Sequence, residues 1–160
     1  EDCYAVWREG RAPPHDVLVT NPPFSGDHKE RCLRHCVQSG RPWAVVLPNY
    51  CATKQYFQKI TAPCGDGLFY GVPKDMYEFE HPEGTGHQSS PFFSLWFVCF
   101  GSHSRAVVDW YRKTVSKEGK GGLRLCTTVR ELGENKAVSL EKRMNPRQRK
   151  AARKKKMGLA

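Results

Sequence analysis

An Asn-Pro-Pro-Phe sequence directly after a short apolar run is the feature that most limits how this chain can fold. The candidate strand Val17 to Thr20 leads straight into Asn21, Pro22, Pro23 and Phe24. Proline has no backbone N–H, so two consecutive prolines cannot continue a central strand. The strand must therefore end at Asn21, and the prolines hold the following residues in a fixed, extended loop.

The loop brings specific groups to the carboxyl end of a strand: the Asn21 amide, backbone carbonyls and the Phe24 ring. Ligands bind at this end of the strands in open α/β sheets. The alternative is an ordinary proline-rich turn, since Pro-Pro pairs are common. Asn-Pro-Pro-aromatic directly after a β-branched strand is much less common, which favours a functional interpretation.

The Asn21–Phe24 sequence resembles the catalytic motif of S-adenosylmethionine-dependent amino-group methyltransferases, chiefly those that methylate adenine N6. The resemblance covers about residues 1 to 102, and some members of this superfamily methylate a glutamine amide in a protein instead. It implies a Rossmann-like class I methyltransferase fold of the α/β class, with S-adenosylmethionine as cofactor. It also implies nucleic acid as the first candidate for the methyl acceptor.

The chemistry of an exocyclic amine explains these residue types. The lone pair of the amine is delocalised into the ring, which makes the nitrogen a poor nucleophile. The side-chain oxygen of Asn21 and the carbonyl of Pro22 can accept its two hydrogens and favour a tetrahedral nitrogen. Pro23 would fix the loop and Phe24 would stack on the base. The leaving group is a neutral thioether, so catalysis is mostly positioning, and a base in a duplex must first be flipped out.

The resemblance implies two further pairs of site residues. In the family, an acidic residue some way before the catalytic strand binds the adenine of the cofactor, and Asp2, followed by Cys3, is similarly placed. The end of the next strand lines the pocket for the flipped base or the cofactor, which assigns Pro48 and Asn49 to substrate binding. The alternatives are a surface Asp near a terminus and a strand-end turn that caps the next helix.

The remaining pattern alternates helices and strands. Helices are expected over about 28–39, 53–60 and 105–115, and strands over 43–47 and 68–70, with another short strand around 77–79 and a polar loop over 81–90. The segment 92–100 is apolar on both faces and is expected to be core rather than a base-stacking stripe. Residues 123–132 are ambiguous between strand and helix. In the resembled fold, the last strand returns antiparallel within the sheet.

A group of His and Cys residues in the first of these helices, His28, Cys32, His35 and Cys36, raises the question of a metal site. A helix rises about 1.5 Å per residue, which separates positions 28 and 36 by about 12 Å, too far for one zinc ion. A two-ligand site completed from elsewhere stays open, but ordinary core cysteines are favoured. The seven cysteines follow no disulfide framework, which indicates reduced thiols in an intracellular compartment.

The basic residues are concentrated at the carboxyl end. The chain has a formal net charge of +10, of which residues 141–160 carry +8. We expect this tail to be disordered alone and to contact nucleic acid or direct the protein to the nucleus or nucleolus; a solvated tail is the alternative. The longest apolar run is too short to span a membrane, and no secretory signal is visible, so the expected location is cytoplasmic or nuclear.

A glycine-rich loop that would cradle the methionine part of the cofactor does not precede Asn21. Gly65–Gly67 and Gly119–Gly122 lack the strand-then-helix context of such a loop. The chain is therefore expected to be the carboxyl half of a longer protein: a partial methyltransferase domain over 1–115, a linker and ambiguous element over 116–140, and a basic tail over 141–160. The alternatives are a protein side-chain amide methyltransferase and a non-catalytic nucleic-acid-binding remnant of the fold.

Overall fold

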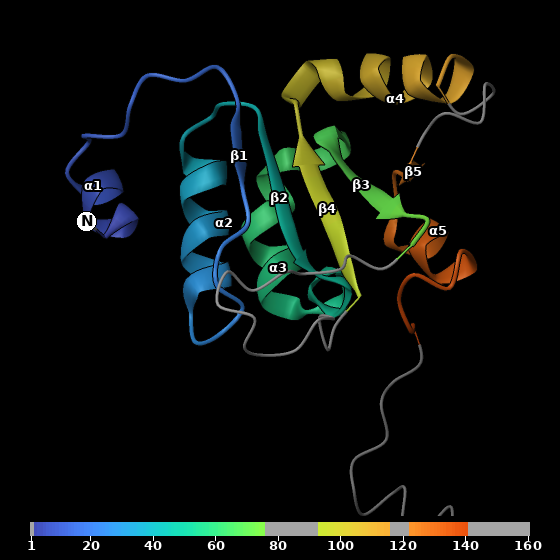
Figure 1. Cartoon of the computed structure of the whole chain (residues 1–160), viewed down its shortest axis with the longest axis horizontal. Helices are drawn as coiled ribbons and strands as arrows, with labels where there is room; N and C mark the ends of the chain where they lie inside the picture. The colour runs from blue at the N-terminus through green and yellow to red at the C-terminus, as the bar shows by residue number, and fades with distance from the viewer. Residues whose placement is uncertain (1, 76–92, 116–121, 141–160) are drawn as a thin grey trace, which may run out of the picture.

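The computed structural model describes residues 2–75, 93–115 and 122–140, which form an α/β fold around a five-stranded sheet (Figure 1). The strands lie side by side in the order β1-β2-β4-β3-β5. In chain order they are β1 (Leu18–Thr20), β2 (Trp43–Pro48), β3 (Leu68–Pro73), β4 (Ser94–Cys99) and β5 (Leu123–Cys126).

The sheet is mixed and mostly antiparallel. β1 and β2 are parallel, with Leu18 opposite Trp43 and Thr20 opposite Val45. β4 runs antiparallel to both β2 and β3, and β5 runs antiparallel to β3. The expectation that the apolar strand near 92–100 lies antiparallel within the sheet is confirmed. Because β1 and β2 are parallel, their carboxyl ends lie at the same edge of the sheet.

The helices are α1 (Cys3–Arg8), α2 (His28–Gln38), α3 (Gln55–Thr61), α4 (Ser104–Lys113) and α5 (Val129–Glu134), and 3₁₀ turns cover Asn49–Thr53, Ala62–Gly67 and Gly101–His103. The helices predicted over 28–39, 53–60 and 105–115 are confirmed to within two residues at each end. α2 is followed by Gly40, whose positive φ of 65° gives the left-handed turn that commonly ends a helix.

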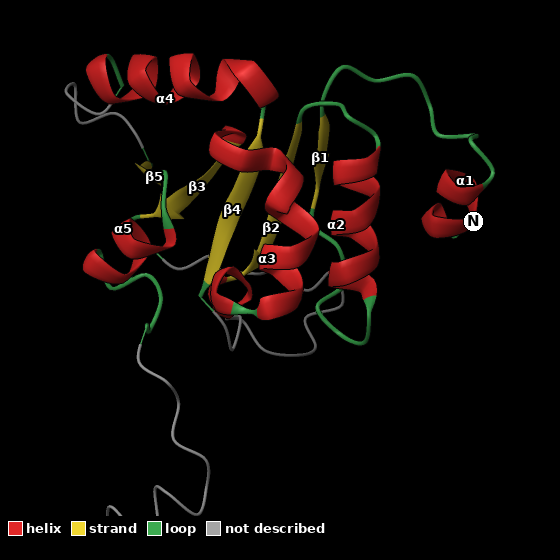
Figure 2. Cartoon of the chain, turned by 180° about the vertical axis from the view of Figure 1, so that it is seen from behind, coloured by secondary structure: helices red, strands yellow, loops and turns green. Residues whose placement is uncertain are grey.

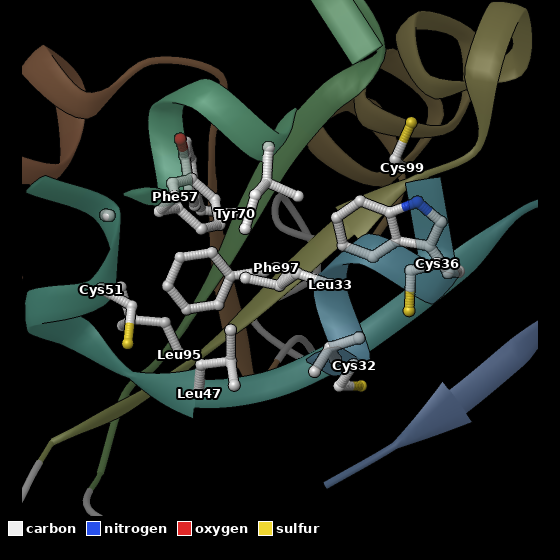
Figure 3. Close-up of a cluster of buried hydrophobic side chains, with 14 of the residues drawn as sticks. Cys32, Leu33, Cys36, Leu47, Cys51, Phe57, Tyr70, Leu95, Phe97 and Cys99 are labelled. Carbon is white, nitrogen blue, oxygen red and sulfur yellow. The ribbon is translucent and has the colours of Figure 1, made fainter. Parts of the chain in front are cut away.

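Two layers of helices cover the sheet. α2, α3 and α5 lie on one face (Figure 2), and α4 packs against the other face through Val108. The larger core lies beneath α2 and α3, where Phe97 of β4 is fully buried (Figure 3). Its ring meets those of Phe57 and Tyr70 edge-on, with centroids 5.0 and 5.5 Å apart. β4 is thus confirmed as a core strand, and burying a side chain of this size contributes about 1.5–3 kcal/mol.

The amino-terminal helix α1 is not among the helices predicted from the sequence. The helix forms because Asp2 caps it, accepting a hydrogen bond from the Tyr4 backbone N–H at 3.0 Å. Packing then holds it: the Tyr4 hydroxyl donates to the His28 carbonyl at 3.0 Å, and the ring of Trp7 stacks on that of His35 at 4.0 Å. Contacts with α2 therefore decide the structure of this segment.

The ambiguous segment 123–132 divides into a strand and a helix. β5 pairs with β3, and the Thr128 hydroxyl then accepts a hydrogen bond from the Glu131 backbone N–H, which begins α5. Leu132 of α5 is buried in the larger core. This part of the predicted 116–140 region therefore belongs to the same sheet and core. The predicted strand around 77–79, the loop 81–90 and the tail 141–160 lie outside the described residues.

β1 forms one edge of the described sheet: within residues 2–75, 93–115 and 122–140 it pairs only with β2. Val19, on this strand, has 62% of its surface exposed, and Val17, just before it, 43%. An apolar, unpaired strand edge favours self-association by strand addition. We expect Val19→Lys to shift the isolated chain toward the monomer, because a lysine on an edge strand opposes edge-to-edge pairing.

Light scattering after size-exclusion chromatography, over a range of protein concentrations, would measure this effect. Leu140→Lys is the matched control, because it adds the same charge at another exposed apolar residue. If both variants reduce self-association equally, net charge rather than the β1 edge controls it.

Candidate functional site

The loop after β1 carries the residues that the sequence singled out. Pro22 is buried, Asn21 is exposed, and Phe24 is half-buried. β1 ends at Thr20, as the two prolines require. The Lys29 ammonium, in the first turn of α2, donates a hydrogen bond to the Phe24 carbonyl and closes the loop against the helix. The arrangement presents the Asn21 side chain to solvent from an anchored backbone.

The carboxyl end of β2 adjoins the loop, because β1 and β2 are paired in parallel. Pro48 is fully buried, so its ring offers little surface to a ligand. Asn49 is half-buried, and its side-chain nitrogen donates to the Ala137 carbonyl at 2.7 Å. Its backbone N–H donates to the Phe93 carbonyl at 2.7 Å. The structure therefore places Asn49 at the predicted edge of the sheet. There its side chain connects the end of β2 to the segment around Ala137.

Ser94 is a polar residue at this edge that the sequence argument did not single out. It opens β4 directly opposite Pro48, and only 3% of its surface is exposed. Its hydroxyl has no hydrogen-bond partner among the described residues. A buried hydroxyl without a partner is costly, which makes Ser94 unusual within the strand. The sequence signal is a serine within an otherwise apolar strand.

The other predicted pair, Asp2 and Cys3, begins α1. Both side chains are exposed, and the Asp2 carboxylate caps the helix. α1 packs on α2 through Tyr4, whose ring also lies 3.9 Å from the Arg31 guanidinium. Burial raises the pKa of Tyr4 to about 12, which keeps its hydroxyl protonated as a donor to the His28 carbonyl. The structure thus ties Asp2 and Cys3 to α2, the helix that follows the Asn21 loop.

The His and Cys side chains of α2 pack against neighbouring residues, although His28 Nδ1 and His35 Nε2 have no hydrogen-bond partner among the described residues. Cys32 and Cys36 are buried, and the neighbouring Cys32 thiol together with burial raises the pKa of Cys36. His35 stacks on Trp7, and burial lowers its pKa, which favours the neutral ring. In the described part of the chain, no three His, Cys, Asp or Glu side chains gather in a way that could hold a metal ion.

Two pockets lie away from Asn21. One, of about 500 Å³, lies at the opposite end of the central strands, where α2, Pro63 and the turn at Gly101 meet. The other, of about 370 Å³, lies beside the carboxyl end of β3 and includes Phe93, the residue that accepts the hydrogen bond from the Asn49 backbone. The second pocket is therefore connected to the edge that carries the Asn21 loop.

No protein-family model, curated protein or solved structure matches the chain in these comparisons. Among the described helices, none has the length and apolar character needed to cross a lipid bilayer.

Proposed function

We propose that the chain forms the acceptor side of an S-adenosylmethionine-dependent methyltransferase that acts on an exocyclic amino group, most simply adenine N6 in nucleic acid. The observation that carries the proposal is the Asn21–Phe24 loop at the carboxyl end of β1, anchored by Lys29 and by the burial of Pro22. The side chain of Asn21 is exposed while its backbone is held. That combination suits a group that must orient a bound amine.

The roles follow from the chemistry of the amine. The Asn21 side-chain oxygen and the Pro22 carbonyl accept its two hydrogens. Pro23 restricts the backbone between these acceptors and Phe24, whose ring stacks on the base. The antiparallel position of β4 between β2 and β3 supports the assignment, because the last strand of the resembled fold also lies antiparallel within the sheet.

The residues of the described chain fit the acceptor but not the whole cofactor, which would supply the methyl group. The Asp2 carboxylate already accepts the capping hydrogen bond of α1. Within the described residues, the loop between β1 and α2 contains one glycine, Gly26. Gly65 and Gly67 lie in a 3₁₀ turn before β3, not in a loop that leads from a strand into a helix.

Residues 1–160 alone should accordingly bind S-adenosylmethionine weakly or not at all. Isothermal calorimetry of the isolated chain checks this directly. S-adenosylhomocysteine serves as a parallel ligand, because it shares the adenosine contacts but lacks the methyl group. Micromolar binding of either ligand would contradict the inference that the cofactor site is incomplete in this chain.

A non-catalytic nucleic-acid-binding protein that keeps the fold is the second candidate, and the incomplete cofactor site favours it. An assay with the longest protein encoded by the gene distinguishes the two candidate functions. It should be incubated with methyl-labelled cofactor, an adenine-containing oligonucleotide and a glutamine-containing peptide. Label on adenine supports the proposal, whereas label on the peptide assigns protein amide methylation. Label on neither acceptor, with oligonucleotide binding intact, supports the second candidate.

A further inference from the structure

A basic pocket lies at the carboxyl end of β3, at the same edge of the sheet as the Asn21 loop but separated from β2 by β4. It has a volume of about 370 Å³, and its lining includes Lys74, Arg124 and Lys136, with Phe93 and Asn135 between them. The three cationic residues come from distant parts of the chain: the end of β3, the middle of β5 and the turn after α5. Their convergence is therefore a property of the fold.

The described residues that line the pocket include three cations and no Asp or Glu. Lys74 and Lys136 are exposed and take part in no ion pair with another described residue. The nearby acids on α5 are paired elsewhere: Glu131 lies 3.6 Å from Arg112, and Glu134 lies 3.0 Å from Arg130.

Arg124 and Asn135 add directional hydrogen-bonding groups. The Arg124 guanidinium donates to the Asn135 side-chain oxygen at 2.7 Å, which leaves its other N–H groups for an anion. The Asn135 side-chain nitrogen donates to the Glu131 carbonyl at 2.7 Å, so the amide is held at both ends. A guanidinium fixed in this way, with two ammonium groups, suits the oxygens of a phosphate.

The turn after α5 connects the pocket to the Asn21 edge. Lys136 has a positive φ of 57°, uncommon for a residue with a side chain. Two backbone hydrogen bonds of 2.9 Å hold the turn. The Lys136 N–H donates to the Gly133 carbonyl, and the Ala137 N–H donates to the Leu132 carbonyl. The Ala137 carbonyl then accepts the side-chain hydrogen bond of Asn49. The residues that line the pocket are thus bonded directly to the end of β2.

We propose that this pocket binds a backbone phosphate of the nucleic-acid strand that carries the target base. The inference rests on the proposed function for the identity of the strand, while the pocket itself follows from the charges and contacts above. Phosphate contacts fix the position and orientation of a strand without reading its sequence. Binding here would hold the strand beside the Asn21 loop while its base occupies the acceptor site. A free phosphate ion offers the same chemistry, and the test distinguishes the two.

The test compares two double variants of the full chain. Lys74→Gln with Lys136→Asn removes two charges from the pocket but keeps the Arg124–Asn135 bond, and Asn tolerates the left-handed backbone at position 136. Lys59→Gln with Lys113→Gln is the control, because these exposed lysines lie on α3 and α4. Both variants keep the basic tail. Affinity for a single-stranded, adenine-containing oligonucleotide is measured at several salt concentrations.

Each phosphate neutralised on a single strand contributes about 0.7 to the slope of log affinity against log salt. Because the pocket is proposed to hold one phosphate, the pocket variant should lose about 0.7 from the slope, whereas the control should lose much less. Equal slopes for the two variants would overturn the proposal. At constant ionic strength, 1 mM inorganic phosphate should not displace the oligonucleotide; displacement from the wild type but not from the pocket variant would make this a free-phosphate site.

Methyl transfer is scored separately in the longest protein encoded by the gene. Transfer to adenine with an unchanged slope in the pocket variant would overturn the pocket and leave the proposed function standing. A reduced slope without transfer to any acceptor would overturn the proposed function and keep the pocket as a nucleic-acid phosphate site.

Discussion

Asn21→Ala should slow methyl transfer by a factor on the order of 10²–10³, or about 2.7–4 kcal/mol of lost transition-state stabilisation. The substitution removes one of the two acceptors that orient the amine. Because Asn21 is exposed and Pro22 anchors the loop, the fold and the position of Phe24 should not change. An acceptor that orients the nucleophile affects turnover more than ground-state binding, so the affinities for acceptor and cofactor should change little.

Single-turnover methylation of an adenine-containing oligonucleotide measures this loss, with acceptor affinity measured in parallel. The experiment requires the longest protein encoded by the gene. Phe24→Ala is the matched comparison, because it removes the stacking ring from the same loop and should weaken acceptor binding by about 1–3 kcal/mol. The two variants separate orientation from stacking. An Asn21→Ala protein that methylates at the wild-type rate would reduce the loop to a rigid turn at the end of a strand.

Phe97→Ala should destabilise the fold by about 3–5 kcal/mol, the usual cost of emptying a buried aromatic position. Phe97 is fully buried in β4 and packs edge-on against Phe57 and Tyr70. Its loss leaves a cavity between the sheet and α3 that surrounding side chains fill only in part. Since a domain is stable by only about 5–15 kcal/mol, this one change should remove a large share of the total.

Urea denaturation followed by circular dichroism gives the change as a shift in the transition midpoint at constant slope. Trp110→Ala is the control, because Trp110 is equally aromatic but 59% exposed on α4. Its change in unfolding free energy should stay within about 0.5 kcal/mol. Similar losses in the two variants would contradict the assignment of β4 as the central core strand.

The elements predicted correctly from the sequence are those with strong local signals. The prolines end β1 whatever the strand packs against, because they lack the N–H that a ladder needs. The spacing of Cys32, Leu33 and Cys36 indicates the buried face of α2. β4 lies between β2 and β3, and helices cover it on both faces of the sheet. Most of its side chains, on both faces, are therefore buried, which matches the apolar sequence of the strand. In these elements the local pattern and the tertiary packing point to the same structure.

The errors and ambiguities occur where packing decides. α1 has six residues, too few to be stable alone, and its contacts with α2 make it helical. The segment 123–132 was ambiguous because a four-residue strand and a six-residue helix adjoin, separated by a Thr cap that periodicity does not reveal.

The candidate site divides in the same way. The Asn21 loop could be predicted because its residues are adjacent in the sequence. The hydrogen bond from Asn49 joins residues 88 positions apart, and the phosphate pocket combines Lys74, Arg124 and Lys136 from three elements. No local pattern indicates such a convergence, because exposed lysines and arginines occur in many parts of the described residues.

The role proposed for the Asn21–Phe24 loop, to hold an exocyclic amine for methylation, can be tested by changing the amine itself. The longest protein encoded by the gene should be given methyl-labelled S-adenosylmethionine and one of two oligonucleotides that differ only at the target base. One carries adenine, and the other carries purine, which keeps the ring for stacking but has no amino group. We expect label on the adenine oligonucleotide, none on the purine oligonucleotide, and similar affinity for both. Equal labelling of the two, or labelling of neither, would contradict the claim.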